Sequence, residues 1–233
     1  MEIKDKLNAL ERLFDLYDQY SQQLPVACRK HCAHCCTCNV TLTSIEARHI
    51  IKALRPERRA DLEHNLSPQL DRQRFQPQIT LNHLAQGYLN KQEPPEEPID
   101  ADWGPCPLLE NNACPIYEVR PFGCRCLLSR QDCGISGYAE IDAYTITVNY
   151  VFSQFIEHLD HDGISGNFSD VLLCLDWEND NAKPPLNTGD PRCHVIANRP
   201  IPLLLIPPEH QGEITALVNQ LHAIVTAQPE TSQ

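Results

Sequence analysis

The sequence has no long hydrophobic run. Its longest apolar stretch, IPLLLIPP at residues 201–208, is short and closed by prolines, whereas a membrane-spanning helix needs about 20 consecutive apolar residues. The opening residues, MEIKDKLNAL, mix acids with lysines and lack the apolar region of a secretory signal. We therefore expect a protein of the cytoplasm that does not enter a membrane.

Basic residues are scarce as well. The chain has 19 Lys and Arg against 31 Asp and Glu, which gives a formal net charge of −12 at pH 7. Because nucleic-acid binding relies on clustered basic side chains, we expect no nucleic-acid partner. The motifs of phosphate-binding loops, serine hydrolases and zincins are missing, and so is the glycine-rich G-x-G turn that commonly holds S-adenosylmethionine.

Cysteine is abundant by contrast, with twelve residues in the chain. Five of them lie in CRKHCAHCCTC at residues 28–38, and four more lie in CPLLENNACPIYEVRPFGCRC at residues 106–126. An even number of cysteines can form a disulfide scaffold. However, the clustering, the length of 233 residues and the lack of an export signal favour metal ligation in a reducing compartment.

Apolar residues at intervals of three and four predict amphipathic helices along most of the chain. The predicted helices cover residues 2–24, 42–54, 56–70, 80–92, 142–160, 167–177 and 207–228. Thr43 or Ser44 is a suitable N-cap for the second helix. The predicted apolar stripe of the fourth helix comprises Leu81, Leu84, Ala85, Tyr88 and Leu89. Residues 142–160 begin with β-branched side chains, so a strand is the alternative there, although a helix fits better.

The acidic, proline-rich segment EPPEEPID at residues 93–100 predicts an extended linker. Together these patterns predict a mainly α fold in which helices pack around irregular cysteine-rich metal-binding loops. We expect a single domain over residues 1–233. It would comprise an N-terminal helix at 2–24, a cysteine-cluster core at 28–133 and a C-terminal helical part at 142–227.

The first cysteine run offers four ligands with the spacing C-x3-C-x2-C-C, namely Cys28, Cys32, Cys35 and Cys36. Four thiolates suit a tetrahedral zinc ion or the corners of a [4Fe–4S] cluster. The adjacent pair is unusual because neighbouring side chains diverge, so both ligate most readily if they reach different metal atoms. This favours a multi-iron cluster or a two-metal site; the alternative is that one of the pair is a spare buried thiol.

The second run offers five further candidate ligands. They are Cys106, Cys114, Cys124, Cys126 and Cys133, of which the last is a weaker candidate, as is Cys38 in the first run. Arg120 and Arg125 lie on either side of Cys124. Their charges can offset those of several thiolates, or they can donate hydrogen bonds to the sulfurs. Ordinary surface salt bridging is the alternative for both arginines.

The two runs together resemble the YkgJ-type cysteine-cluster family, known as a zinc- or iron-chelating domain. Its later motifs, C-P-x-L, C-x-I-Y and R-P-x-x-C-R, all occur between residues 106 and 125. The first motif departs by one residue, because three residues instead of two separate Cys28 from Cys32. The resemblance implies metal binding, as zinc or an iron–sulfur cluster, by Cys28, Cys32, Cys35, Cys36, Cys106, Cys114 and Cys124.

Seven ligands exceed one tetrahedral site and fall short of two. A bridging thiolate, a spare cysteine or an eighth ligand such as Cys126 would reconcile the count. His31 and His34 interleave with the first run and either ligate zinc or face solvent. Cys174 is interpreted as a small core residue, and the pair Cys193-His194 as a loop that can reach the site from the C-terminal half.

The leading hypothesis is a cysteine-cluster metalloprotein with a role in redox or modification chemistry, with an iron–sulfur cluster ahead of zinc. A structural zinc module for protein interaction is one rival. An enzyme similar to flagellin lysine-N-methylase, which resembles this family over the same cysteine region, is another. The sequence leaves open whether the protein catalyses a reaction, and it does not identify the protein partner or substrate. It does predict that the two runs form one spatial unit.

Overall fold

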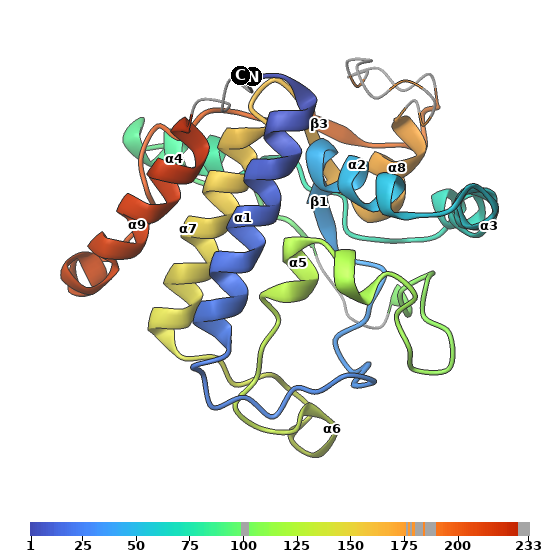
Figure 1. Ribbon diagram of the computed structural model, residues 1–233, viewed down its shortest axis with the longest axis horizontal. Helices are drawn as coiled ribbons and strands as arrows, with labels where there is room; N and C mark the ends of the chain where they lie inside the picture. The colour runs from blue at the N-terminus through green and yellow to red at the C-terminus, as the bar shows by residue number, and fades with distance from the viewer. Residues whose placement is uncertain (99–102, 176, 178, 180–183, 185–189, 228–233) are drawn as a thin grey trace, which may run out of the picture.

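The computed structural model describes residues 1–98, 103–175, 177, 179, 184 and 190–227 (Figure 1). The fold is mainly α, as predicted, and also contains a small sheet. The helices are α1 Ile3–Ser21, α2 Ser44–Ala53, α3 Pro56–Leu66, α4 Leu81–Leu89, α5 Phe122–Arg125, α6 Cys133–Ser136, α7 Ala143–Leu159, α8 Phe168–Cys174 and α9 Gln211–Thr226. In the described part of the chain, 3-10 turns cover Ser67–Asp71, Tyr117–Val119 and Pro208–His210. Among the described residues, no helix combines the length and the apolar character needed to span a bilayer.

Helices α1 and α7 lie side by side, and α9 packs against both (Figure 1). On α1, Leu10, Leu13 and Tyr17 recur at intervals of three and four residues and are almost completely buried. The ring of Tyr17 meets Phe152 of α7 edge-on at 5.1 Å between centroids, and Phe122 of α5 at 4.8 Å. The short helix α5 is therefore anchored in the core of this bundle.

A second apolar cluster lies between α2, α8 and the sheet. Ile50 of α2 and Val171 of α8 are fully buried in it. The second cysteine run contributes Leu108 and Ile116, each 5% exposed, to the same cluster. Because α5 is anchored in the first cluster and these two residues in the second, the second cysteine run is held from both sides.

The sheet comprises β1 Thr41–Thr43, β2 Ile164–Asn167 and β3 Val195–Ala197, antiparallel and in that order. Gly166 of β2 is opposite Leu42 on one side and Val195 on the other. A Cβ atom on Gly166 would lie 2.8 Å from the carbonyl oxygen of His194, so the close approach of the backbones requires glycine there.

Several helix predictions are confirmed with small shifts in their bounds. Thr43 is the N-cap of α2 and forms a capping box with Glu46. Residues 143–159 are helical, which excludes the strand alternative. The first helix ends at Ser21, not at residue 24. Residues 93–98 of the predicted linker form no helix or strand, and residues 99–100 lie outside the described part of the chain.

The predicted apolar stripe of α4 is confirmed at Ala85 but is wrong at the end of the helix. Tyr88 and Leu89 are about half exposed, at 50% and 51%, whereas the polar side chain of Asn82 is fully buried beside Ala85. The Asn82 amide donates hydrogen bonds to the carbonyl oxygens of Gln154 (3.1 Å) and Arg199 (2.9 Å). These bonds compensate for the loss of hydration and fix the helix by a polar contact that periodicity does not reveal.

Candidate metal centre

The two cysteine runs lie side by side, which confirms that they form one spatial unit. The amide of Cys106 donates to the carbonyl oxygen of Cys36 (2.9 Å), and the amide of Cys38 donates to that of Gly104 (3.0 Å). Between these two bonds, residues 37 and 105 form an isolated antiparallel bridge. Backbone hydrogen bonds therefore align the end of the first run with the beginning of the second.

All seven cysteines that match the family motif line one cavity of about 110 Å³, here called the inner cavity. They are Cys28, Cys32, Cys35, Cys36, Cys106, Cys114 and Cys124. Each is a free thiol of intermediate burial. Two segments that are separated in sequence by residues 37–105 thus direct their cysteines to a common space.

The position of Cys124 follows from the way α5 is attached to α2. Phe122, the first residue of α5, donates its amide hydrogen to the Glu46 carboxylate at 2.7 Å. The same carboxylate accepts the amide hydrogen of Thr43 at 2.8 Å. A Cβ on Gly123 would lie 3.0 Å from the carbonyl oxygen of Thr41, so α5 also approaches β1 closely. The sequence signal Thr-x-x-Glu predicts the cap of α2, but not that the same glutamate holds α5.

Cys28 is held against the chain that follows α5. Its sulfur accepts a hydrogen bond from the amide of Ser129 (3.2 Å), and the amide of Ala27 donates to the Ser129 carbonyl oxygen (2.8 Å). His31 has a left-handed backbone, with φ of 72°, which turns the chain between Cys28 and Cys32. The extra residue in the first motif is thus accommodated by a turn, and both cysteines still line the inner cavity.

Four of the cavity cysteines form a closely coupled set. Every pair among Cys36, Cys106, Cys114 and Cys124 interacts electrostatically. Burial raises the pKa of Cys106 to about 11. Burial, and then the neighbouring thiols of Cys106 and Cys114, raise the pKa of Cys124 far above its ordinary value. Cys106, Cys114 and Cys124 therefore hold their protons tightly, so a metal that binds them must displace the protons.

Cys35 and Cys36 share a hydrogen bond between their side chains. The bond lowers the pKa of Cys36, and the same bond, together with burial, raises that of Cys35. Cys35 therefore keeps its proton while Cys36 is the more readily ionised member. The two adjacent thiols of this unusual motif both line the inner cavity, so neither is a spare core residue.

Cys126 does not line the inner cavity, although it follows Cys124 by two positions. Its thiol donates to the carbonyl oxygen of Gly123 (3.7 Å) and packs against the helical bundle. Burial raises its pKa to about 12. Residues two apart on a helical turn point in different directions, so this predicted eighth ligand is not among the cavity cysteines, although its thiol interacts electrostatically with those of Cys124 and Cys35.

The two arginines line the inner cavity, but their hydrogen bonds go elsewhere. Arg125 is 5% exposed, pairs with Asp18 at 3.0 Å and donates to the carbonyl oxygens of Glu118 and Arg120. Arg120 stacks on the ring of Tyr117 at 4.0 Å. Its positive charge opposes the effect of burial on the pKa of Cys114. Arg120 is thus the arginine whose charge acts on a cavity thiol, and Arg125 fastens α5 to α1.

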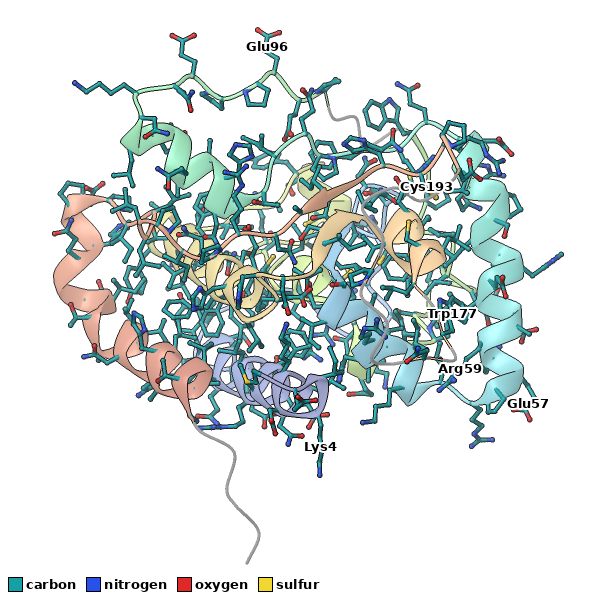
Figure 2. All side chains as sticks on the ribbon, turned by 90° about the horizontal axis from the view of Figure 1, so that it is seen from above. Lys4, Glu57, Arg59, Glu96, Trp177 and Cys193 are labelled. Carbon is teal, nitrogen blue, oxygen red and sulfur yellow. The ribbon has the colours of Figure 1, made fainter. Side chains whose placement is uncertain are left out.

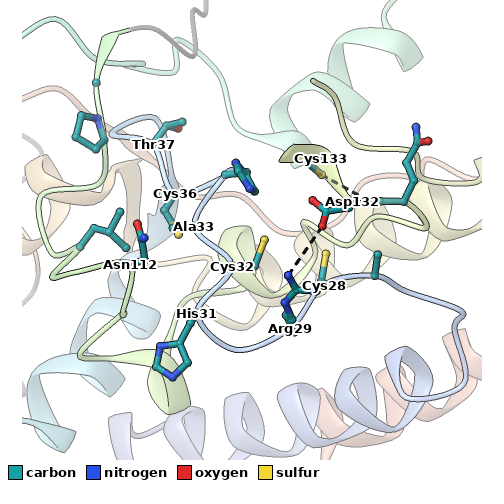
Figure 3. Close-up of a pocket in the computed structure, with 16 residues that line it drawn as sticks. Cys28, Arg29, His31, Cys32, Ala33, Cys36, Thr37, Asn112, Asp132 and Cys133 are labelled. Atoms are coloured by element: carbon teal, nitrogen blue, oxygen red, sulfur yellow. Dashed lines mark hydrogen bonds and ion pairs between the residues drawn. The ribbon is translucent and has the colours of Figure 1, made fainter. Parts of the chain in front are cut away.

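A larger cavity of about 520 Å³, the outer cavity, adjoins the inner one (Figure 3). Three cysteines line both cavities, namely Cys28, Cys32 and Cys36. Cys133, His34 and Asp132 line the outer cavity alone. His31 lines both, with its ring directed away from the sulfurs in Figure 3.

The remaining candidates do not line the inner cavity, although Cys38 interacts electrostatically with Cys106. Cys38 donates weakly to Asn39 and to the carbonyl oxygen of Gln73. Cys174 and Cys193 neighbour each other at the end of α8, so the structure does not bring Cys193 to the other cysteines. Cys174 is half-buried and packs against the second apolar cluster, so it lies at the edge of the core and not inside it.

Among the described residues, no group of three or more His, Cys, Asp or Glu side chains stands ready to hold a metal ion. The donor set nevertheless fits a thiolate-bound metal, because seven sulfurs and no carboxylate line the inner cavity. Thiolates repel one another unless a cation neutralises them, so a metal that binds here would take the place of the thiol protons.

Residues 27–140 match the family model CxxCxxCC, described as a putative zinc- or iron-chelating domain. This range contains both cysteine runs and every cysteine of the inner cavity. The searches of curated proteins and of solved structures gave no match.

Proposed function

We propose that the inner cavity binds an iron–sulfur cluster, because residues 27–140 match the CxxCxxCC model of zinc- or iron-chelating domains. The observation that carries the proposal is the gathering of seven cysteines around one cavity of about 110 Å³. A single tetrahedral zinc ion takes four ligands. A multi-iron cluster presents several metal atoms to the thiols around it, so it suits this crowded set of cysteines better than a single ion does.

The coupled set Cys36, Cys106, Cys114 and Cys124 supplies the four corner ligands in this proposal. The mutual interaction of every pair supports this choice, since cluster ligands must approach a common centre. The positive charge of Arg120 near Cys114 tempers the negative charge that four thiolates bring. An iron–sulfur cluster held there supplies one-electron transfer.

The position of the site supports redox or modification chemistry over a closed structural role. Cys28, Cys32 and Cys36 line both cavities, so the outer cavity gives a partner or substrate a route to the cysteines. A structural zinc site is closed on all sides. We propose a protein partner or substrate in the cytoplasm, where thiolates remain reduced.

The test is the metal content of protein purified without air. We expect about four iron atoms and equivalent acid-labile sulfide per chain, with a broad visible absorption that oxygen bleaches. Protein purified in air should contain zinc, because thiolate sites accept either metal and availability decides. Stoichiometric zinc without sulfide in the anaerobic protein would overturn the proposal in favour of a structural zinc module.

A matched pair of variants tests the ligand set. Cys124→Ser removes a corner ligand and should abolish cluster binding. Cys126→Ser changes the next cysteine, whose thiol points into the helical bundle, and should retain iron and sulfide at the level of the unchanged protein. Equal loss in both variants would show that the cluster is not held by the coupled set.

A further inference from the structure

Two cysteines outside the family domain contact one another. The thiols of Cys174 and Cys193 share a side-chain hydrogen bond, although residues 175–192 separate them in sequence. Cys174 is the last residue of α8, and Figure 2 shows Cys193 beside this helix. Both residues are of intermediate burial, so small reagents can reach them.

A buried ionic network holds the two residues together. Asp170 precedes Cys174 by one helical turn, so the two side chains share a face of α8. The Asp170 carboxylate is fully buried and accepts the amide hydrogen of His194, the residue after Cys193, at 3.1 Å. Arg74 pairs with the same carboxylate at 2.5 Å and donates to the carbonyl oxygen of Arg192 at 2.8 Å. The backbone on both sides of Cys193 is thus bound to the network.

The network explains why the contact between the thiols is not accidental. A thiol pair on flexible loops would be brought together only transiently. Here, Asp170 and Arg74 fix the chain around Cys193, and β3 begins two residues later at Val195. The two sulfurs are therefore already in contact in the reduced protein, before a disulfide forms between them.

We propose that Cys174 and Cys193 are a redox dithiol that forms an intrachain disulfide by exchange with a low-molecular-weight disulfide of the glutathione type. One protein thiol loses its proton and attacks a sulfur of the small disulfide, and one small thiol leaves. The second protein thiol then loses its proton, attacks the mixed disulfide and releases the second small thiol. The two protein thiols are oxidised by two electrons, and the small disulfide is reduced to two thiols.

Cys193 is the better attacking group of the two. Burial raises the pKa of both thiols, but the hydrogen bond from Cys174 and the charge of Arg74 act in the opposite direction at Cys193. Exchange is slow because little of either thiol is ionised at neutral pH. The disulfide would tie the end of α8 to the chain that enters β3. The pair is separate from the metal-binding cysteines, none of which interacts with it in the described part of the structure.

The experiment uses full-length, metal-loaded protein incubated with equal concentrations of oxidised and reduced glutathione, without air. Free thiols are then blocked with N-ethylmaleimide, and the digested protein is mapped by mass spectrometry. We expect a peptide linked between Cys174 and Cys193 in most chains. In Cys193→Ser the linked peptide should disappear and Cys174 should be recovered free or joined to glutathione.

Cys38→Ser is the matched control, because the Cys38 thiol is also of intermediate burial and bonds to oxygen atoms. This variant should leave the linked peptide at the level of the unchanged protein. No link between Cys174 and Cys193, or a preferred link from either to a cavity cysteine, would overturn the proposal. Loss of bound metal in the double variant Cys174→Ser, Cys193→Ser would also overturn it, since the pair would then be a metal ligand.

Discussion

Glu46 connects the hydrophobic interior to the metal centre, and its replacement by glutamine tests that connection. The side chain is 3% exposed. Its carboxylate accepts hydrogen bonds from the amide of Thr43 (2.8 Å), the hydroxyl of Thr43 (2.9 Å) and the amide of Phe122 (2.7 Å). Phe122 begins α5, which carries Cys124. In Glu46→Gln the shape remains, but one acceptor oxygen becomes an NH2 group that faces a donor.

The magnitude follows from these contacts. Hydrogen bonds to charged groups contribute about 1.5–3 kcal/mol each, and an unsatisfied buried donor costs a similar amount. We expect Glu46→Gln to lower the free energy of unfolding by about 3 kcal/mol. For a chain of this size that corresponds to a fall of roughly 6–12 °C in the melting temperature.

Glu157 of α7 is the matched control. It is 4% exposed, and its carboxylate likewise accepts two backbone amides, from Asn82 and Arg199, both at 2.9 Å. Neither partner belongs to a segment with a cavity cysteine. Glu157→Gln should therefore lower the stability to a similar extent and leave metal binding unchanged.

The assay has two parts. Urea unfolding at pH 7 gives the stability of each variant, and a chelator then competes for the metal at urea concentrations well below both unfolding midpoints. We expect Glu46→Gln to bind the metal about tenfold more weakly than the unchanged protein does, an effect typical of residues that orient metal ligands. Glu157→Gln should bind it as tightly as the unchanged protein. A stability within 0.5 kcal/mol of the unchanged protein, or equal metal release from both variants, would refute the argument that Glu46 positions Cys124.

Three further predictions concern the folded framework. Burial raises the pKa of Asp160 to about 6, so the folded state binds this proton more tightly than the unfolded state does. From pH 5 to pH 7 the unchanged protein should thus lose about 1 kcal/mol of stability relative to Asp160→Asn in urea unfolding. Gly166→Ala should destabilise the sheet by steric clash, whereas Gly212→Ala, in open space on α9, should stabilise the protein by about 0.5–1 kcal/mol in the same assay. Arg74→Met leaves the buried Asp170 charge unpaired, so calorimetry should show a loss of about 3–5 kcal/mol.

The sequence predicts the long helices well, because each carries a periodic apolar face and local capping signals. The bounds of α2 follow from Thr43 and Glu46, which stand in the order of a capping box. The strands could not be predicted, since three or four residues are too few for an alternating pattern. The polar face of α4 was also hidden, because the partners of Asn82 lie more than seventy residues away.

The cysteine motifs predict which residues gather, but not the partner of every thiol. Seven spaced cysteines identify the inner cavity because a shared metal requires them to converge. Cys126 satisfies the same local pattern, yet its direction is set by the helical turn of α5 and by packing against the bundle. The contact between Cys174 and Cys193 depends on the ion pair of Arg74 with Asp170. Long-range contacts of this kind leave no periodic signal in the sequence.

The two runs differ in what holds them, and this difference gives the metal its structural role. The second run is anchored by apolar side chains, with Leu108 and Ile116 in one cluster and Phe122 in the other. In the first run, residues 28–38 are all described, and none of them is buried. Backbone bonds hold its end, but apolar burial cannot order the rest. Metal–thiolate bonds would therefore order the first run by fixing it to the second run, which apolar contacts already hold in place. Metal binding is then part of the folding of this segment.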